Sequence, residues 1–218
     1  MGVDERKKIG AGMGEGTDEM GLAIAGAQYR WPNRTIPYAF APDLGCKDAA
    51  AAAIAHWNSK SCIRFVPRLA EADYVLLYRL PGYALADVGR CGGEQKVGLG
   101  DSSTIGTIIH ELGHAVGLWH EHCRNDRDHW VEIDLSNIPF GKKGNFAPNK
   151  IAGKAVATED VGAYDYGSIM HYGERDFAID KRDPTLKLLK PLPAGVVVGQ
   201  REGLSPGDIA AVEMMYPA

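Results

Sequence analysis

The first regular pattern of hydrophobic and polar positions is the segment TIPYAF (35–40), which has the composition of a β-strand. Pro37 within it predicts a position at the edge of a sheet, because proline cannot donate a hydrogen bond to a neighbouring strand. The segment 47–60 then repeats apolar residues at helical spacing, which predicts a helix. Its inward positions are Ala50, Ala53, Ile54 and Trp57.

Three more strand-like segments follow this helix: IRFVP (63–67), YVLLY (74–78) and KVGLG (96–100). A strand, helix, strand order predicts parallel pairing, because parallel strands need a long crossover connection. The last segment is short, which predicts an edge strand.

Two further helices are predicted. Ser102 or Ser103 can cap a helix that runs through TIGTIIHELGHAVG (104–117). Near the end of the chain, an N-cap, a first-turn proline and a third-position acid are provided by Ser205, Pro206 and Asp208. The inward positions of this closing helix are expected to be Ile209, Val212 and Tyr216.

Two stretches show neither helical nor strand periodicity in their hydrophobic residues. Residues 1–21 are rich in glycine and charge and predict a leader or propeptide remnant. Residues 141–167 are polar and predict irregular structure.

The composition is that of a soluble globular chain, with 45% hydrophobic and 24% charged residues. A net charge of -4 leaves no basic surplus to hold a phosphate backbone, so nucleic acid is not expected as a partner. No apolar run approaches the roughly 18 residues that a membrane helix needs. The sequence as given starts without a signal peptide, so one was removed earlier or the protein stays inside the cell.

The cysteines, Cys46, Cys62, Cys91 and Cys123, have no C-x-x-C spacing, which favours two disulfides over a cysteine zinc site. Free buried thiols are the alternative. Disulfides would indicate an oxidising compartment, and we expect a secreted protein. Cys46 and Cys62 flank a predicted helix about 20 Å long, whereas a disulfide needs Cα atoms within roughly 7 Å. Any bridge must therefore involve Cys91 or Cys123.

Residues 110–120 read HELGHAVGLWH and contain the candidate metal-binding residues. His110 and His114 stand four apart on one helix face, where their imidazoles can share a metal ion. On a straight helix, His120 would lie about 15 Å from His110, while zinc needs each nitrogen at about 2 Å. Gly117 can end the helix in a left-handed turn, so that the chain brings His120 back to the metal.

The alternative is that these are ordinary surface or core histidines, but the added glycine and third histidine make a chance match far rarer than a bare H-E-x-x-H. Three neutral histidines leave a fourth position on zinc for water, which marks a catalytic site. Zinc lowers the pKa of its bound water toward about 7, and Glu111 is placed to take the proton. One catalytic Zn²⁺ is therefore the expected cofactor, and no other is expected.

This segment and the following RNDRDHW (124–130) resemble the astacin family of metzincin zinc metallopeptidases, in particular bacterial-type members. Over residues 22–216, further segments are similar to astacin sequences in the same order: CIRFVPR (62–68), ADVGR (86–90), SIMHYG (168–173) and GQREGLS (199–205). The resemblance implies a zinc-dependent endopeptidase that acts on polypeptides.

The resemblance also implies roles for three residues. Met170 belongs to a methionine turn beneath the zinc. Tyr172 binds the metal or supports the oxyanion of the transition state, for which a phenol O–H is a suitable donor. Glu121 receives the trimmed amino terminus of mature relatives. By themselves these would be a core methionine, a half-buried aromatic and a surface glutamate. Structural or exposed positions are expected for His56, His122, His129 and His171.

The chain departs from the family in its cysteines. Astacins commonly pair the cysteine of the CIRFVPR segment with one near the carboxyl end, where this chain reads EMMYPA, so that pairing does not transfer. Residues 1–21 contain no cysteine, which excludes a latency thiol and leaves Asp4 and Asp18 as candidate carboxylate plugs.

We expect a catalytic domain over 22–218 with an α+β zincin or metzincin fold in two lobes. The first lobe, about 22–117, holds a twisted, mostly parallel sheet with two helices. The second, about 118–218, is mostly irregular and ends in a helix, and the active-site cleft lies between. The edge strand at 96–100 would bind an extended substrate as an antiparallel strand. A monomer is expected.

Two alternatives stay open at this point. A binding protein or toxin could keep the zinc fold without catalysis, although the presence of Glu111 and Tyr172 counts against it. A zinc hydrolase that acts on a non-peptide amide is compatible with the ligand set.

Overall fold

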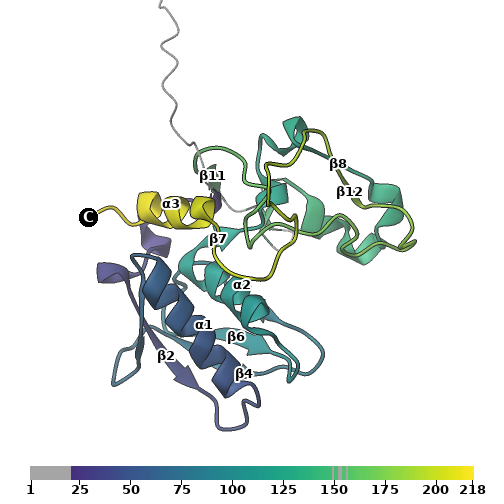
Figure 1. The fold of residues 1–218 in the computed structure, drawn as a ribbon. Coiled ribbons are helices and arrows are strands. Elements are labelled where there is room, and N and C mark those ends of the chain that lie inside the picture. Colours follow the sequence, from purple (N-terminus) through teal and green to yellow (C-terminus); the bar gives the residue numbers. More distant parts are fainter. Residues whose placement is uncertain (1–20, 149, 152–153, 156) are drawn as a thin grey trace, which may run out of the picture.

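The structure is a computed structural model that describes residues 21–148, 150–151, 154–155 and 157–218. Its first part is a five-stranded sheet with two helices side by side on one face (Figure 1). In spatial order the strands are β3 (Arg64–Pro67), β2 (Thr35–Phe40), β4 (Tyr74–Arg79), β6 (Glu94–Leu99) and β5 (Leu85–Ala86). The first four run parallel and β5 is antiparallel, as a twisted, mostly parallel sheet requires.

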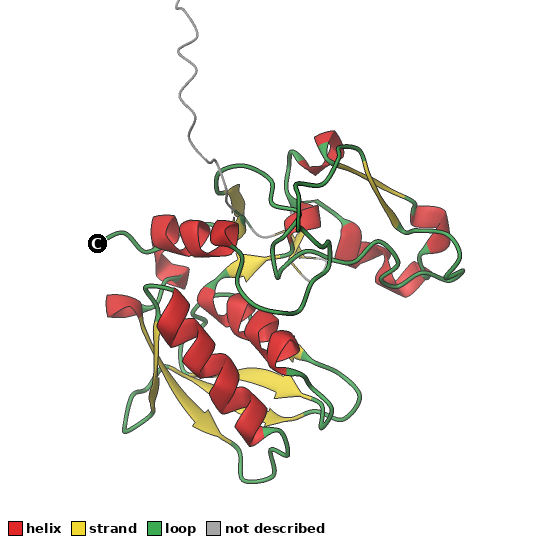
Figure 2. Cartoon of the chain, in the orientation of Figure 1, coloured by secondary structure: helices red, strands yellow, loops and turns green. Residues whose placement is uncertain are grey.

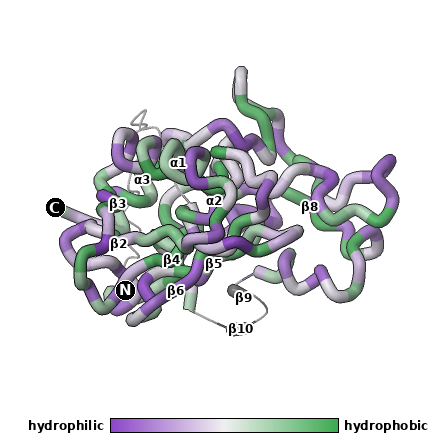
Figure 3. The backbone as a smooth tube through the Cα atoms, turned by 90° about the horizontal axis from the view of Figure 1, so that it is seen from below, coloured by the Kyte–Doolittle hydropathy of each residue, from purple (hydrophilic) through white to green (hydrophobic). Residues whose placement is uncertain are grey.

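The helices on this sheet are α1 (Lys47–Lys60) and α2 (Ile105–Val116). The inward positions predicted for α1 are all buried. Figure 3, seen from below, shows both helices on the same side of β2, β4 and β6. The N-cap of α2 is Thr104, whose hydroxyl accepts from the N–H of Thr107, so the prediction of Ser102 or Ser103 is wrong.

Both predictions of an edge strand are wrong. Strand β2 lies between β3 and β4, and Pro37 is tolerated because pairing with β4 begins only at Tyr38. Strand β6 lies between β4 and β5, since Leu85 pairs with Gly98 and Ala86 with Val97. The edge beside α2 is therefore β5, a two-residue strand too short to be recognised from sequence.

Two short 3₁₀ helices precede the sheet of the first part. They are η1 (Ala27–Tyr29) and η2 (Pro32–Arg34).

The second part of the chain is mostly loop, drawn in green in Figure 2. The second part contains η3 (Glu121–Cys123), η4 (Arg127–His129), η5 (Leu135–Asn137), η6 (Phe140–Phe146), and the antiparallel pairs β8 (Val131–Ile133) with β12 (Leu186–Leu188) and β9 (Lys150–Ile151) with β10 (Lys154–Ala155). The irregular structure expected over 141–167 is thus broken only by short elements in the described residues.

A small antiparallel sheet joins the two parts. Its central strand is β1 (Leu22–Ile24), which lies between β7 (Leu118–Trp119) and β11 (Thr158–Asp160). Because β7 follows the end of α2 and β11 belongs to the second part, β1 connects the two parts directly.

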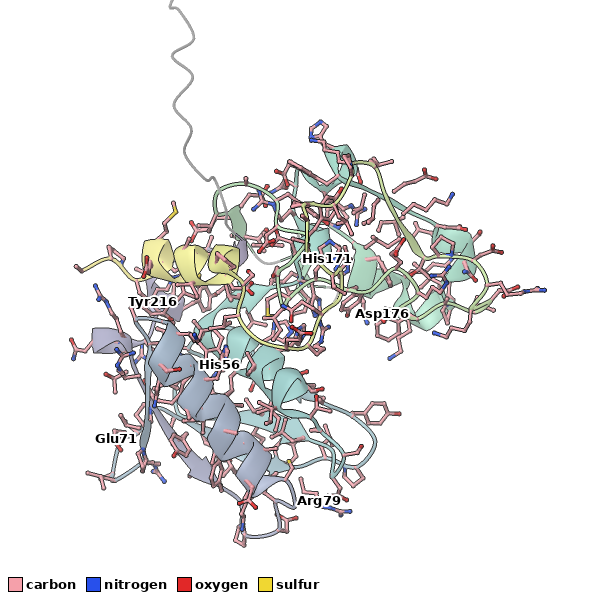
Figure 4. The ribbon with its side chains drawn as sticks, viewed as in Figure 1. His56, Glu71, Arg79, His171, Asp176 and Tyr216 are labelled. Carbon is pink, nitrogen blue, oxygen red and sulfur yellow. The ribbon has the colours of Figure 1, made fainter. Side chains whose placement is uncertain are left out.

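The closing helix α3 (Pro206–Met215) begins with the predicted capping box of Ser205 and Asp208. It packs into the core of the first part: Val212 is buried there, and the Tyr216 hydroxyl donates to the carbonyl of Val116 over 2.7 Å (Figure 4). By packing, the terminal helix thus belongs to the first part rather than to the second. None of the described helices is long and apolar enough to cross a membrane.

All four cysteines are free, so the expectation of two disulfides is wrong. The whole length of α1 separates Cys46 from Cys62. Cys123 is enclosed in a hydrophobic cluster with Trp119, while Cys91 is exposed. An even number of cysteines was therefore a poor guide, because their positions in the fold do not bring them together.

Candidate active site

Three histidines converge between the two parts of the molecule. His110 and His114 lie on α2, and His120 follows β7. All three are buried, with 4 to 7% of each residue exposed, and their potential ligand atoms lie within 4.8 Å of one another. The predicted metal site is therefore assembled as the spacing suggested.

Gly117 makes this convergence possible. It ends α2 with φ 119° and ψ 6°, in the left-handed region, and its N–H donates to the carbonyl of His114 over 2.8 Å. The chain then reverses into β7 and delivers His120 to the other two histidines. An L side chain at this position would be strained, which confirms the predicted role of this glycine.

Hydrogen bonds to the backbone fix two of the three imidazoles. The Nδ1 of His110 donates to the carbonyl of Ile169 over 2.8 Å, and the Nδ1 of His114 donates to the carbonyl of Leu118 over 3.0 Å. Each bond leaves the Nε2 lone pair available to a metal. His120 differs, because its buried Nδ1 has no hydrogen-bond partner among the described residues.

Burial keeps these imidazoles neutral. It lowers the pKa of His114 to about 4 and holds the pKa values of His110 and His120 well below the usual value. Neutral, enclosed imidazole nitrogens suit zinc, and a bound ion would satisfy donor atoms that the protein leaves without a partner. The residues present therefore fit a zinc ion.

Glu111 lies next to the first histidine with 6% of its surface exposed, and its Oε2 has no hydrogen-bond partner in the described residues. Burial raises the pKa of this carboxyl to about 8 in the metal-free chain, against a smaller opposing effect of Arg201. A carboxyl whose pKa lies near neutrality suits a group that must accept and release a proton.

Tyr172 packs at a tilt beside the histidines, with its ring centroid 4.6 Å from that of His120 and 4.1 Å from that of His122. Burial raises the pKa of its hydroxyl, so the phenol is an O–H donor at neutral pH. Met170 is buried under α2, where a Cβ placed on Gly113 would lie 2.8 Å from its Sδ. Gly113 thus allows the close approach of Met170, a role that sequence reasoning missed.

Glu121 is completely buried, unlike a surface glutamate. Its Oε1 accepts from the N–H of Asp165 over 2.9 Å, and Arg124 lies 3.7 Å away, while its Oε2 has no described partner. A Cβ placed on Gly21 would lie 3.5 Å from this Oε2. The carboxylate therefore faces the start of the described chain, where the resemblance implied an amino terminus.

The remaining histidines take structural positions. His122 and His171 are fully buried, and His129 is exposed. The Nε2 of His56 on α1 accepts from the N–H of Leu204 over 3.1 Å, and Figure 4 shows it away from His171. The structural or exposed positions predicted for these four residues agree with the structure.

Arg201 is a further residue that sequence reasoning missed. Its Nη1 donates to the carbonyls of Ile169 and His171, so a single guanidinium binds the segment that carries Met170. The segment GQREGLS had drawn attention to this region, but nothing in it indicated what the arginine contacts.

Comparison with known proteins decides the family. The sequence profile of the Astacin peptidase family matches residues 23–217. The chain belongs to the astacin family. A solved astacin structure agrees: the chain resembles high choriolytic enzyme 1, a hatching enzyme zinc-protease from the medaka fish Oryzias latipes, with a TM-score of 0.73 and 31% identity over 86% of this chain and 92% of that one. The expected α+β metzincin fold is thereby confirmed.

Relatives among characterised proteins are longer than this chain. Nematocyst expressed protein 6 from Nematostella vectensis is 39% identical over 195 residues, which cover 87% of this chain and 66% of that protein. Zinc metalloproteinase nas-13 from Caenorhabditis elegans is 38% identical over 200 residues, 89% of this chain and 42% of that protein. The chain thus spans less than two thirds of the length of either relative.

Astacins are metallopeptidases with one catalytic zinc ion, so family membership confirms the cofactor that the sequence predicted. The residue-by-residue roles in this chain, and its assignment to bacterial-type members, stay predictions.

Proposed function

We propose that this chain is a zinc-dependent endopeptidase that hydrolyses peptide bonds in polypeptides. The observation that carries the proposal is the convergence of three buried, neutral histidines with a buried carboxyl and a phenol: His110, His114, His120, Glu111 and Tyr172. Zinc, when bound, lowers the pKa of a water molecule and polarises the scissile carbonyl.

The protein groups move the protons and share the new charge. Glu111 accepts the proton of the attacking water and passes it to the leaving amine, a cycle that its enclosed position supports. The hydroxyl of Tyr172 donates a hydrogen bond to the oxyanion that forms at the scissile carbonyl.

An extended substrate can add to the antiparallel edge strand β5. The side chain of Leu85 on this strand is half exposed, and β5 packs beside α2, which carries Glu111. Main-chain hydrogen bonds to a sheet edge align a polypeptide without reading its sequence. The strand proposed to bind the substrate is therefore β5, rather than the predicted segment 96–100.

We also propose that residues 22–218 form the catalytic domain and that 1–21 precede it as a leader. The buried, unpartnered Oε2 of Glu121 close to Gly21 supports a site for an amino terminus created near Leu22. The candidate plugs Asp4 and Asp18 lie outside the described residues.

We also propose that the protein is secreted and that it is a monomer. Membership of a peptidase family supports a polypeptide substrate. The free cysteines withdraw the support that their even number had given to an oxidising compartment. Fractionation of the source culture into cells and medium, followed by size-exclusion chromatography, tests both statements.

The decisive experiment measures zinc content and cleavage of casein or gelatin for the wild-type chain and for Glu111→Gln. We expect the variant to keep zinc and to lose turnover by about 10²–10⁴-fold, because the positioned base is gone. A chelator should abolish wild-type cleavage, and added zinc should restore it. A zinc-loaded but inactive wild-type chain would favour the non-catalytic alternative, whereas activity on small amides alone would favour a different hydrolase.

A further inference from the structure

The acceptor of the His110 N–H is a backbone carbonyl far away in sequence. Ile169 lies 59 residues after His110, in the segment before Met170. The group that accepts the second N–H of a metal-binding histidine fixes its tautomer and ring orientation, and changes there typically alter metal affinity. A carbonyl cannot be replaced by mutation, but the side chains that hold its peptide can.

Side chains hold Ile169 from both of its backbone groups. The Oδ2 of Asp208 accepts the N–H of Ile169 over 2.9 Å, and the Nη1 of Arg201 donates to its carbonyl over 3.0 Å. The Oδ1 of Asp208 also accepts from the hydroxyl of Ser168 over 2.6 Å. Asp208 is 2% exposed, Ser168 1% and Ile169 0%, so these bonds form away from water, where they constrain geometry most.

Asp208 does more than a helix cap requires. As the third residue of α3 it accepts the N–H of Ser205 over 2.9 Å, which completes the capping box. That bond uses one donor, while Ser168 and Ile169 provide two more. A buried carboxylate that served only the helix would not need donors from the segment beside the histidines.

We propose that Asp208 is a positioning residue of the metal site, which fixes the Ile169 peptide and thereby holds the His110 imidazole with its Nε2 toward the ion. This inference rests on the proposed function, in which His110 binds zinc. Asp208 does not contact the metal or the substrate in this arrangement. It acts through one peptide group.

The test compares the full chain with Asp208→Asn and with the control Ser205→Ala. The Oδ2 of Asp208 accepts both backbone N–H groups and its Oδ1 accepts the Ser168 hydroxyl, so the NH₂ of asparagine faces either two N–H donors or the hydroxyl. In both orientations the charge-assisted bond that holds the Ile169 peptide is lost. Ser205→Ala removes the hydroxyl that caps α3 and contacts Asp165, but touches neither Ile169 nor Ser168. Zinc dissociation constants come from chelator competition, the absorption spectrum of the cobalt-substituted protein reports ligand geometry, and thermal unfolding of the metal-free chain reports stability.

For Asp208→Asn we expect zinc affinity to fall about tenfold or more and the cobalt spectrum to change. For Ser205→Ala we expect a lower melting temperature with unchanged affinity and spectrum. If Asp208→Asn binds zinc as the wild type does, or if both variants weaken binding equally, the inference is overturned. A wild-type chain that binds no zinc would instead overturn the proposed function itself.

If Asp208→Asn does not fold, Ser168→Ala provides the test of the inference. This variant removes one bond to the Asp208 carboxylate and the acceptor of the Met170 N–H, and it keeps both capping bonds of α3. We expect severalfold weaker zinc binding, and an unchanged dissociation constant would overturn the inference.

Discussion

The two parts of the molecule are held together by different means. In the first part, one large hydrophobic cluster joins the sheet to its helices. In the second part, the described residues form two small clusters, four buried residues that include Val131 and three that include Phe146. Polar bonds supplement them, as where the amide of Asn137 donates to the carbonyls of Asp180 and Asp183.

The active site draws on both kinds of structure. A regular helix supplies His110, Glu111 and His114, whose relative positions follow from helical geometry. The irregular part supplies His120 and Tyr172, which individual contacts hold in place. Removing a residue from each part should therefore reveal whether the irregular part is needed for metal binding, for turnover or only for stability.

The largest effect is expected for His120→Ala. Two helical histidines alone rarely hold zinc, so the variant should lose the metal and all cleavage activity. Zinc content after dialysis is the measurement, and His129→Ala, an exposed histidine of the same part, is the control and should keep one zinc. Unchanged zinc stoichiometry in His120→Ala would mean that His120 is not a ligand.

A smaller effect is expected for Tyr172→Phe. Loss of one oxyanion donor typically costs about a hundredfold or more in turnover, while KM and zinc content should change little. Tyr166→Phe is the matched control, because its hydroxyl donates to the carbonyl of Trp130 rather than to a group of the candidate metal site. Nearly normal turnover in Tyr172→Phe would reduce this residue to a packing role.

Trimming of the chain tests the join between the parts. A chain that starts near Leu22 places an ammonium group close to the unpartnered Oε2 of Glu121, and pairing a buried charge can bias local structure by a few kcal/mol. We expect trimming to raise turnover severalfold, and Glu121→Ala to remove the gain.

Equal activity in the long and short chains, with and without Glu121→Ala, would contradict this expectation. Activation of the untrimmed chain by Asp4→Ala or Asp18→Ala would instead favour a carboxylate plug.

The smallest effect concerns stability in acid. His171 is fully buried, its Nδ1 donates to the carbonyl of Tyr172, its Nε2 accepts from the hydroxyl of Tyr164, and burial lowers its pKa to about 4. Since the folded pKa lies below the unfolded value near 6.5, the unfolded chain binds more protons between these values. Stability is therefore full above pH 6.5 and falls as the pH drops toward 4.

Denaturant unfolding of the metal-free chain at pH 7, 6 and 5 measures this loss. One such histidine should contribute on the order of 2 kcal/mol between pH 6.5 and 5. His171→Gln should reduce the dependence by this share, because the buried histidines of the site also have lowered pKa values and contribute the rest. The exposed His129→Gln should leave it unchanged. Parallel curves for His171→Gln and the wild type would show that its protonation is not coupled to unfolding.

Sequence periodicity predicted the first part well for a physical reason. The helix 47–60 and the strands around Phe65 and Leu77 bury alternating or helically spaced residues against one core, and that spacing is visible in the sequence. The convergence of the three site histidines was equally visible, because helix geometry and Gly117 determine where they point.

The remaining features depend on contacts that the sequence does not encode locally. The acidic residue predicted to cap α3 also binds Ile169, about forty positions away, and no pattern announces such a pairing. Arg201 acts through backbone carbonyls, which every residue possesses. The mistaken edge at 96–100 arose because β5 is only two residues long, whereas Pro37 misled because pairing of β2 with β4 begins only at Tyr38. The family resemblance, rather than the residues alone, indicated Tyr172 and Glu121.

The position of β1 has a consequence for biosynthesis. Its residues leave the ribosome early, yet its two partner strands end at Trp119 and Asp160. At 5–20 residues per second, β1 waits roughly 5–20 s with both edges unpaired, and it keeps one edge unpaired until Asp160 has emerged. Leu22 and Ile24, which are buried in the folded chain, stay uncovered during this time. An exposed strand edge of this kind favours pairing with other chains. The strand β1 is thus secured on both of its edges only after all three histidines of the site have been synthesised.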